Sequence, residues 1–324
     1  MSRFLQPTMR EAVQYQDDKK YIQDIMDILP EDVLYKQIML TNEMMWSNKI
    51  KKPKIEKWLN NFTGEVDDHI YEKRIALWLL LNYVYYNEEE VRHLCKALFN
   101  KFIHYQIKNN KDILGEDIKS TLSNLLSRVC FSYLGQPSES SAYMLYYFRQ
   151  ENDLMTDYFP KNIERLPKSI DTIIYIDDVT ISGSQAGKYL ERDISNNNNI
   201  NNYFLLTLIS AEEALKQIKQ SEMEVISCIQ LEEHNKCFST KSMIFINMEE
   251  HIEKAKKIAK EYGKSLYPRH PLGYKNGEYA FGFFYNTPDN TLPIFWSDVN
   301  GWNPIMKRHL KITWRKEYGF GRFL

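Results

Sequence analysis

The stretch that decides the fold spans residues 171–190 and reads DTIIYIDDVTISGSQAGKYL. Within it, residues 173–176 form a short run of β-branched and aromatic side chains between polar neighbours. Such a run is typical of a strand that is buried on both faces, as in the middle of a parallel sheet. We therefore expect a strand over residues 172–177, which ends in the two carboxylates of Asp177 and Asp178.

A turn of small residues follows the two carboxylates. It runs from Thr180 to Gln185 with Gly183 inside it, and we expect a helix from about Gln185 to Glu191. Ligands of open α/β sheets bind where the strands end, and backbone N–H groups at the start of a helix suit a phosphate. The stretch therefore predicts an anion site beside an acidic pair. The alternative is an ordinary buried strand that ends in a solvated acidic turn.

The chemistry of the acidic pair narrows the kind of ligand. Two ionised carboxylates about 5 Å apart repel each other by roughly 3 kcal/mol at an effective dielectric constant near 20. Ribose hydroxyl groups or a Mg²⁺ ion would relieve this repulsion, because they supply hydrogen-bond donors or positive charge. A ligand with a phosphate at one end and vicinal hydroxyls beside it fits both halves of the stretch. Phosphoribosyl diphosphate is such a ligand.

At these residues the sequence resembles the phosphoribosyl diphosphate loop of the type I phosphoribosyltransferases. The resemblance implies that Asp177 and Asp178 form the catalytic pair, hold the ribose hydroxyls and bind Mg²⁺. It also implies that the turn holds the 5′-phosphate through Thr180, Ser182, Gly183, Ser184 and Gln185. Two positions depart from the family pattern. Ile181 replaces its first threonine, where some purine-using members have an aspartate base, and Gln185 replaces its last. These departures favour ligand binding over turnover.

The composition is that of a globular protein of about two domains. The chain has 324 residues, of which 43% are hydrophobic and 26% charged, and its net charge is -1. So small a charge gives no global field that would attract nucleic acid or an anionic membrane. The four cysteines are far apart, which favours reduced thiols over a zinc site. The N-terminus has no apolar signal core and residues 75–84 are too short a run to span a bilayer, so we expect a cytoplasmic protein.

Residues 1–115 are expected to form a helical N-terminal domain. Pro30 opens a helix that Pro53 would stop. The next helix, Tyr71–Tyr86, is apolar nearly all round and belongs inside a bundle. Asn87 would cap a third helix, whose first turn is acidic. No Pro/Gly/Ser-rich linker follows, so we expect this domain to pack on the rest of the chain.

A basic run lies between Trp46 and Trp58 and consists of Lys49, Lys51, Lys52 and Lys54. Lysines beside aromatic residues can meet the phosphates of a nucleic acid. The more common interpretation of such a run is a solvated helix end.

Residues 116–324 are expected to form a phosphoribosyltransferase-like α/β domain. Two helices come first, and residues 135–141 separate them. The serines of this break could cap the second helix or start an anion site. The pattern Gly-x-Pro-Ser-x-Ser, followed by tyrosines and Arg149, resembles a phosphoribosyltransferase-like group of bacterial conflict and anti-phage systems, some of them beside retrons. Ser138, Ser140 and Arg149 are therefore candidate ligand contacts.

Strands and helices then alternate along the chain. We expect strands over 203–209 and 225–231, a helix over 211–220 capped by Ser210, and a helix over 248–262 closed by Gly263. Alternation of this kind indicates a parallel sheet with right-handed crossovers.

A strand over residues 279–285 leads into a loop with two prolines, which should be rigid. Asn286, Asn290 and Trp296 of this loop could stack on a base and hydrogen-bond its edge. A packed lid or domain contact is an equally good interpretation. The loop also resembles the conflict-system group, so that resemblance covers residues from about 125 to 308.

The sequence thus predicts an α/β fold, in which a phosphoribosyltransferase-like parallel sheet with flanking helices follows an N-terminal all-helical portion. Three classes of function remain open. The protein could be a phosphoribosyltransferase or a nucleotide-cleaving enzyme that breaks a glycosyl bond. It could be a catalytically inactive sensor of phosphoribosyl diphosphate or a nucleotide, or a scaffold that binds a partner protein or nucleic acid. The resemblance implies a role in bacterial anti-phage defence.

Overall fold

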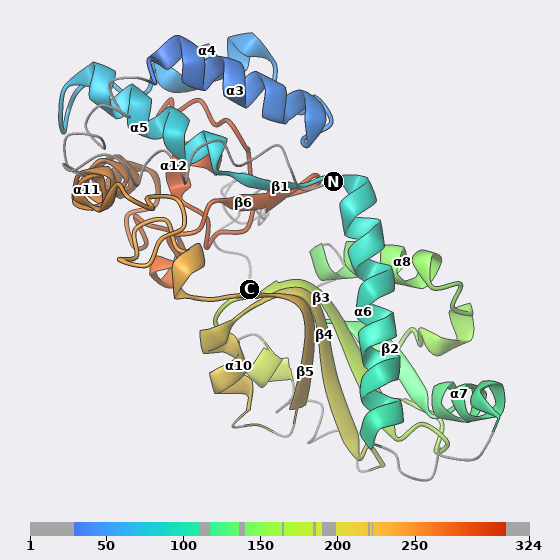
Figure 1. Cartoon of the computed structure of the whole chain (residues 1–324). Coiled ribbons are helices and arrows are strands. Elements are labelled where there is room, and N and C mark those ends of the chain that lie inside the picture. The colour runs from blue at the N-terminus through green and yellow to red at the C-terminus, as the bar shows by residue number, and fades with distance from the viewer. Residues whose placement is uncertain are drawn as a thin grey trace, which may run out of the picture.

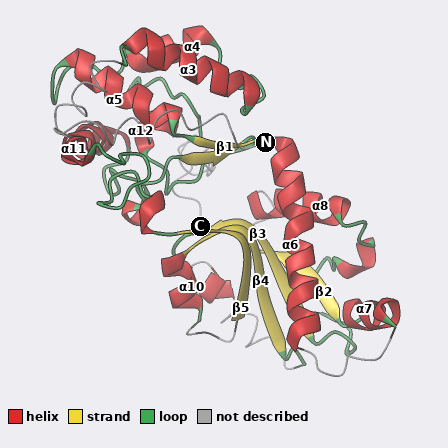
Figure 2. Cartoon of the chain, in the orientation of Figure 1, coloured by secondary structure: helices red, strands yellow, loops and turns green. Residues whose placement is uncertain are grey.

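The computed structural model describes residues 29–109, 117–135, 140–163, 165–183, 186–189, 199–219, 221 and 223–308. These residues form two lobes, at the upper left and lower right of Figure 1, and Figure 2 shows their helices and strands in the same view. We call residues 88–231 the sheet lobe, and residues 29–86 together with 233–308 the helical lobe. The expected domain boundary between residues 115 and 116 lies outside the described residues.

The sheet lobe is built on four parallel strands in the order β2–β3–β4–β5. Their bounds are β2 Val129–Tyr133, β3 Thr172–Thr180, β4 Asn202–Ala211 and β5 Met223–Leu231. The predicted central strand is confirmed, because β3 lies between β2 and β4 and is buried along almost its whole length. The sequence pattern does not predict β2, since so short an apolar run cannot be distinguished from a piece of buried helix by its periodicity.

Helices cover both faces of this sheet. They are α6 Glu88–Asn109, α7 Ile118–Leu126, α8 Ser140–Glu151, α10 Glu212–Ile218 and the 3₁₀ turn η2 Thr156–Tyr158. On one face α6 and α8 share a core with Ile174 and Ile176 of β3. On the other face α10 and the helical residues 186–189 share a core with Ile173 and Tyr175. The apolar run of β3 is therefore needed on both faces of the sheet.

The helical lobe combines the beginning and the end of the described chain. Its elements are α3 Glu31–Met44, α4 Lys52–Leu59, α5 His69–Leu81, α11 Glu249–Leu266, α12 Pro293–Trp296, η3 Glu233–Asn235 and η4 Tyr274–Asn276. A two-stranded parallel sheet joins the two segments, since β1 Val84–Tyr86 pairs with β6 Phe281–Phe283. Within the described chain, no helix is both long and apolar enough to cross a membrane.

One hydrophobic core runs through the helical lobe. The apolar helix α5 lies inside this core, together with α11 and with residues of α3, α4 and α12. Polar contacts cross it as well: Trp58 Nε1 donates to Ile294 O at 2.8 Å, and Trp78 Nε1 donates to Ile244 O at 2.9 Å. The expectation that the N-terminal helices pack on the rest of the chain is confirmed by these contacts.

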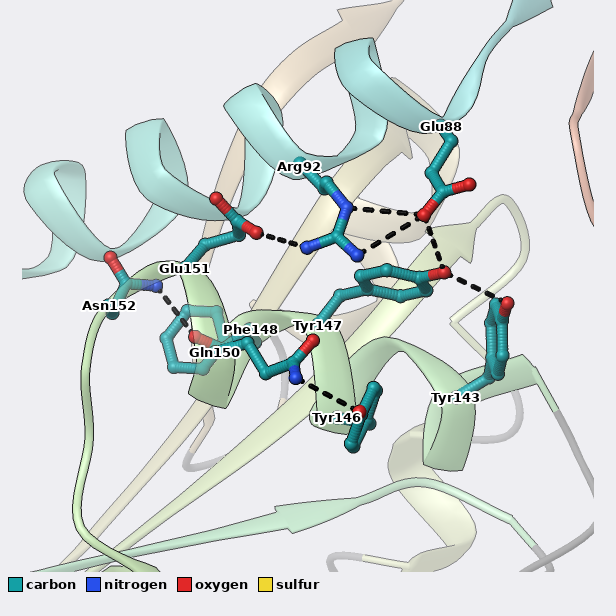
Figure 3. A network of polar contacts seen from close by, with 9 residues as sticks. All are labelled: Glu88, Arg92, Tyr143, Tyr146, Tyr147, Phe148, Gln150, Glu151 and Asn152. Carbon is teal, nitrogen blue, oxygen red and sulfur yellow. Dashed lines mark hydrogen bonds and ion pairs between the residues drawn. The ribbon is translucent and has the colours of Figure 1, made fainter.

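A network of polar contacts holds α8 against α6 (Figure 3). Arg92 lies between two carboxylates, with Nη1 2.5 Å from Glu151 Oε1 and Nη2 3.2 Å from Glu88 Oε1. Its guanidinium carbon lies 4.4 Å from the ring centroid of Tyr147, whose hydroxyl donates to Glu88 at 3.1 Å. The hydroxyls of Tyr147 and Tyr143 are 3.0 Å apart. The network therefore holds α8, from Tyr143 to its last residue Glu151, against the first turns of α6.

Two boundaries of the N-terminal helices differ from the expectation. Pro53 does not stop the first helix but lies in the first turn of α4, where the missing N–H is tolerated. The helix expected over Tyr71–Tyr86 ends at Leu81, because the residues of β1 pair with β6 instead. The cap at Asn87 is confirmed, since its Oδ1 accepts the Glu90 N–H at 2.9 Å.

Two helix ends in the C-terminal half also differ. Ser210 does not cap α10; it belongs to β4, and its hydroxyl donates to Ser227 Oγ at 2.8 Å. Gly263 does not close α11, which continues to Leu266. A Cβ atom at Gly263 would lie 2.0 Å from the carbonyl oxygen of Pro271. This glycine is therefore required for close backbone packing and not for ending the helix.

Candidate functional site

A cavity of about 470 Å³ lies between the two lobes, where β2 and β3 end. From the sheet lobe it is lined by residues 177–183 and by Leu134, Ser140, Ser141, Ala186 and Lys188. From the helical lobe it is lined by Tyr274, Phe283, Asn286, Pro288, Asp289, Asn290 and Arg308. The ends of parallel strands are where ligands of α/β sheets bind. The position of the cavity therefore agrees with the site expected from the sequence.

The two predicted acids lie inside β3 and not after it. The strand continues to Thr180, so both carboxylates are held by its extended backbone. The Asp178 N–H donates to Asp177 Oδ1 at 3.0 Å, and the Val179 N–H donates to Asp178 Oδ1 at 2.9 Å. Asp177 is 8% exposed and Asp178 is 5% exposed. The pair is therefore almost removed from water, although both residues line the cavity.

Asp178 also has a hydrogen-bond donor from the helical lobe. The Tyr285 hydroxyl donates to Asp178 Oδ2 at 3.0 Å. Burial raises the pKa of Asp178, and hydrogen bonds with Tyr285, Asp177 and Ser140 oppose part of that rise. Burial, followed by the charge of Asp178, raises the pKa of Tyr285 well above its ordinary value, so the phenol remains protonated and can donate. Both lobes thus contribute to the environment of this one carboxylate.

The turn after β3 contains a left-handed backbone conformation at its glycine, Gly183. Gly183 has φ of 66°, a left-handed conformation that favours glycine. The Gly187 N–H donates to Gly183 O at 3.1 Å, which starts the short helix at residues 186–189. Ser182 and Gly183 line the cavity directly before this helix. Backbone N–H groups in such a position can bind a phosphate.

The cavity brings together most of the described residues that the sequence suggests as ligand contacts. They are Asp177, Asp178, Thr180, Ser182, Gly183, Ser140, Asn286 and Asn290. Three further candidates, Ser138, Ser184 and Gln185, lie outside the described residues.

Two candidates, Arg149 and Trp296, are not among the residues that line this cavity. Arg149 lies in the last turn of α8, with its guanidinium carbon 6.0 Å from the ring centroid of Tyr146. Trp296 is 4% exposed, and its Nε1 donates to Thr291 O at 2.8 Å. Its ring is packed inside the helical lobe, so the structure presents it as a support for the loop and not as a surface for stacking a base.

Sequence reasoning missed Arg308 and Lys188, which line the cavity, and Tyr285, which donates to Asp178. Arg308 is held there by Thr287, whose carbonyl oxygen accepts from Nη1 at 2.6 Å, and by Asp289, 3.4 Å from Nη2. Tyr285 and Arg308 belong to the far end of the chain, and no local pattern connects them with the loop after β3. Lys188 could have been predicted as a cavity residue, because it follows that loop directly in the predicted helix.

The parallel sheet, the buried acidic pair and the turn that leads into a helix define a phosphoribosyltransferase-like α/β protein. The chain belongs to the PRTase-CE family, whose model matches residues 55–308 and thus well over half of the chain. The match begins in α4 and ends at Arg308, so it includes both lobes and both walls of the cavity.

Two solved structures are similar to parts of this chain. The orotate phosphoribosyltransferase from Aeropyrum pernix is 15% identical, with 37% of this chain and 75% of that chain covered and a TM-score of 0.24. The AQ2163 protein from Aquifex aeolicus is 15% identical, with 56% of this chain and 86% of that chain covered and a TM-score of 0.28. No curated protein matches this chain.

We predict that Tyr285→Phe lowers the free energy of unfolding by roughly 1.5–3 kcal/mol at a pH where Asp178 is ionised, as expected for losing a donor to a charged group. Because the pKa of Asp178 is raised in the folded protein, its contribution to stability is complete below the unfolded value near ~3.9 and is lost as the pH rises through the folded value. Removing the phenol raises the folded pKa further. The difference between variant and wild type should therefore grow as the pH rises through the folded pKa of Asp178 in the wild type.

Urea denaturation at several pH values measures this difference. Asp178→Asn is the matched control, because it cannot titrate and its stability should lack this pH dependence. A deficit of Tyr285→Phe that is the same at every pH would show that the phenol acts through packing and not through the carboxylate.

Proposed function

We propose that this protein binds phosphoribosyl diphosphate, or a nucleotide with the same ribose 5-phosphate portion, in the cavity between its lobes. The observation that carries the proposal is the presence of the acidic pair and the Ser182–Gly183 turn on the wall of one cavity. The turn and the helix start after it would hold the 5′-phosphate. Asp177 and Asp178 would accept hydrogen bonds from the ribose hydroxyls. The family assignment supports this choice of ligand class.

The acidic pair also fits a Mg²⁺ ion. Mg²⁺ prefers oxygen ligands and is commonly bound through one or two carboxylates together with substrate phosphates and water. Among the described residues, no group of three or more His, Cys, Asp or Glu side chains could hold a metal ion by itself. Asp177 and Asp178 would therefore hold the ion jointly with the ligand. A bound ion would supply positive charge beside the diphosphate.

The loop lacks a residue that could support turnover, the aspartate that acts as catalytic base in some purine-using phosphoribosyltransferases. Ile181 lines the cavity at the position where some purine-using phosphoribosyltransferases have an aspartate. This favours a sensor, which binds the ligand without cleaving it, as the second candidate function. Turnover would break the bond between ribose C1 and the diphosphate oxygen, diphosphate would leave with the electron pair, and an acceptor nitrogen or a water molecule would form the new bond to C1. Release of labelled diphosphate from phosphoribosyl diphosphate distinguishes the two.

Binding of the proposed ligand should stabilise the folded protein. Phosphoribosyl diphosphate with Mg²⁺ should stabilise the native protein by about 2.7 kcal/mol at a ligand concentration 100 times Kd. Asp177→Asn and Asp178→Asn should remove this stabilisation, while the apo proteins stay as stable as wild type or become slightly more stable, because a crowded charge is gone. Thermal melting with and without ligand measures both effects. Variants that are destabilised yet still stabilised normally by ligand would contradict the sugar-site assignment.

Arg308 and Arg149 allow a matched comparison, because only Arg308 lines the cavity. Arg308→Gln should weaken phosphoribosyl diphosphate binding by about 10-fold or more, because Arg308 lines the cavity and a hydrogen bond to a charged group contributes about 1.5–3 kcal/mol. Arg149→Gln makes the same change in charge outside the lining residues and should leave the Kd unchanged. Calorimetric titration of the two variants decides the matter. Equal effects would mean that the guanidinium of Arg308 does not face the ligand.

We further propose that ligand binding serves bacterial anti-phage defence. The support is the resemblance of residues 135–149 and of the loop at 286–296 to a group of defence-associated proteins. If the proposal is right, a cell that carries this gene with its genomic neighbours should resist some phages, and Asp178→Asn should abolish that resistance. Efficiency of plating measures it. Resistance that is unchanged in the Asn variant would separate the defence role from the cavity.

A further inference from the structure

A second hollow lies in the helical lobe, at the start of α4. It has a volume of about 390 Å³ and is lined by Lys49, Lys51, Pro53, Lys54 and Lys57. We call it the lysine hollow. Each polar side chain among these lining residues is an ammonium group. The one acid of α4, Glu56, is not a lining residue. The hollow therefore offers positive charge and hydrogen-bond donors, without a carboxylate that would neutralise them.

Only some lysines elsewhere in the described chain have acidic partners. Ion pairs are formed by Lys36, Lys216, Lys236, Lys256, Lys264 and Lys307. Among the described residues, no carboxylate lies within ion-pair distance of Lys49, Lys51, Lys54 or Lys57. The whole chain has 43 acidic and 42 basic residues, so positive charge is not in excess overall. Four lysines without a carboxylate partner in the described chain thus concentrate positive charge at the hollow.

The crowding of these ammonium groups has a physical cost. Burial lowers the pKa of Lys49, and burial together with the charge of Lys49 lowers the pKa of Lys54. Both shifts mean that the charged forms are disfavoured in the apo protein. An anion in the hollow would reverse this effect, because an opposite charge nearby favours the charged form. The site is therefore arranged for an anionic occupant.

The start of α4 contributes the positive end of the helix dipole. Its N-cap residue, Lys51, makes no side-chain cap, and the first turn contains no acidic residue. Its N–H groups contribute little, because Pro53 has none and the Lys54 N–H already donates to Lys51 O at 2.9 Å. The helix N-terminus still carries partial positive charge, which adds to the charges of Lys51 and Lys54 and favours an anion.

We propose that the lysine hollow binds the sugar–phosphate backbone of a nucleic acid. A protein partner fits less well, because lysine is depleted in protein–protein interfaces and the core of such interfaces is apolar or aromatic. The two tryptophans that flank these lysines in sequence do not favour a protein partner or a base. Trp46 and Trp58 are buried and cannot stack on a base. Recognition would therefore involve the phosphates and not the bases, and would not depend on sequence.

Binding of a labelled single-stranded oligonucleotide to the apo protein, at several salt concentrations, tests the proposal. The triple variant Lys51→Gln, Lys54→Gln, Lys57→Gln removes three of the charges. Lys49 is left in place, because its ammonium also donates to Phe284 O at 3.1 Å. Each phosphate contact with a single strand contributes about 0.7 to the slope of log K against log salt. The variant should therefore lose about 2 from the slope and on the order of 100-fold in affinity near 0.1 M salt.

The matched control is Lys254→Gln, Lys257→Gln, Lys260→Gln on α11, which makes the same change in net charge. It should retain the wild-type slope of log K against log salt. Both triple variants should have the same thermal unfolding midpoint as the wild type. An unchanged slope in the hollow variant, an equal loss in the control, or tighter binding of polyglutamate or of anionic vesicles than of the oligonucleotide would overturn the proposal. No phosphoribosyl diphosphate is present, so the outcome is independent of the function proposed for the cavity.

Discussion

The hydrogen bond from Tyr285 to Asp178 is the interaction on which the site depends. A buried carboxylate without donors is very unfavourable, because its charge has lost the solvation of water. Asp178 is supplied by its own strand through the Val179 N–H and by the helical lobe through the Tyr285 hydroxyl. The position of Tyr285 is itself restrained, since its ring lies parallel to that of Phe283 in β6, with centroids 5.4 Å apart. The side chain of Asp178 is therefore a point at which the two lobes are joined.

Two other contacts reinforce this arrangement from outside the cavity. The pairing of β1 with β6 places the segment that carries Tyr285 directly after a strand of the helical lobe. The Arg92 network holds α8, and hence Ser140, against α6 on the sheet. Tyr143 of that helix has its ring centroid 5.2 Å from that of Tyr285. The walls of the cavity are thus joined through side chains that do not line it.

The parts of this protein that could be predicted from the sequence are those with a local signal. The strand β3, its acidic pair and the turn at Gly183 are adjacent in the chain, and their side chains show the pattern directly. The short strands β1 and β2 could not be predicted, because their apolar residues also suit a buried helix, and only the partner strand decides between the two. The roles of Tyr285 and Arg308 depend on contacts between distant parts of the chain. Glycine is common at helix ends, so the sequence suggests that Gly263 ends α11. Its actual role is to allow close packing of the backbone against Pro271, which depends on a contact outside the helix.

The helical lobe has a consequence for how the protein is made. Its core combines residues from both ends of the described chain, while the whole sheet lobe lies between them in sequence. A ribosome therefore releases α5, with its apolar surface, long before α11 exists to cover it. Domains generally fold as they emerge, and exposed apolar surface of this kind favours aggregation. We expect the sheet lobe to fold first, and the nascent N-terminal helices to need protection until synthesis is nearly complete. A chain that ends before Tyr274 would lack the wall of the cavity that the helical lobe supplies.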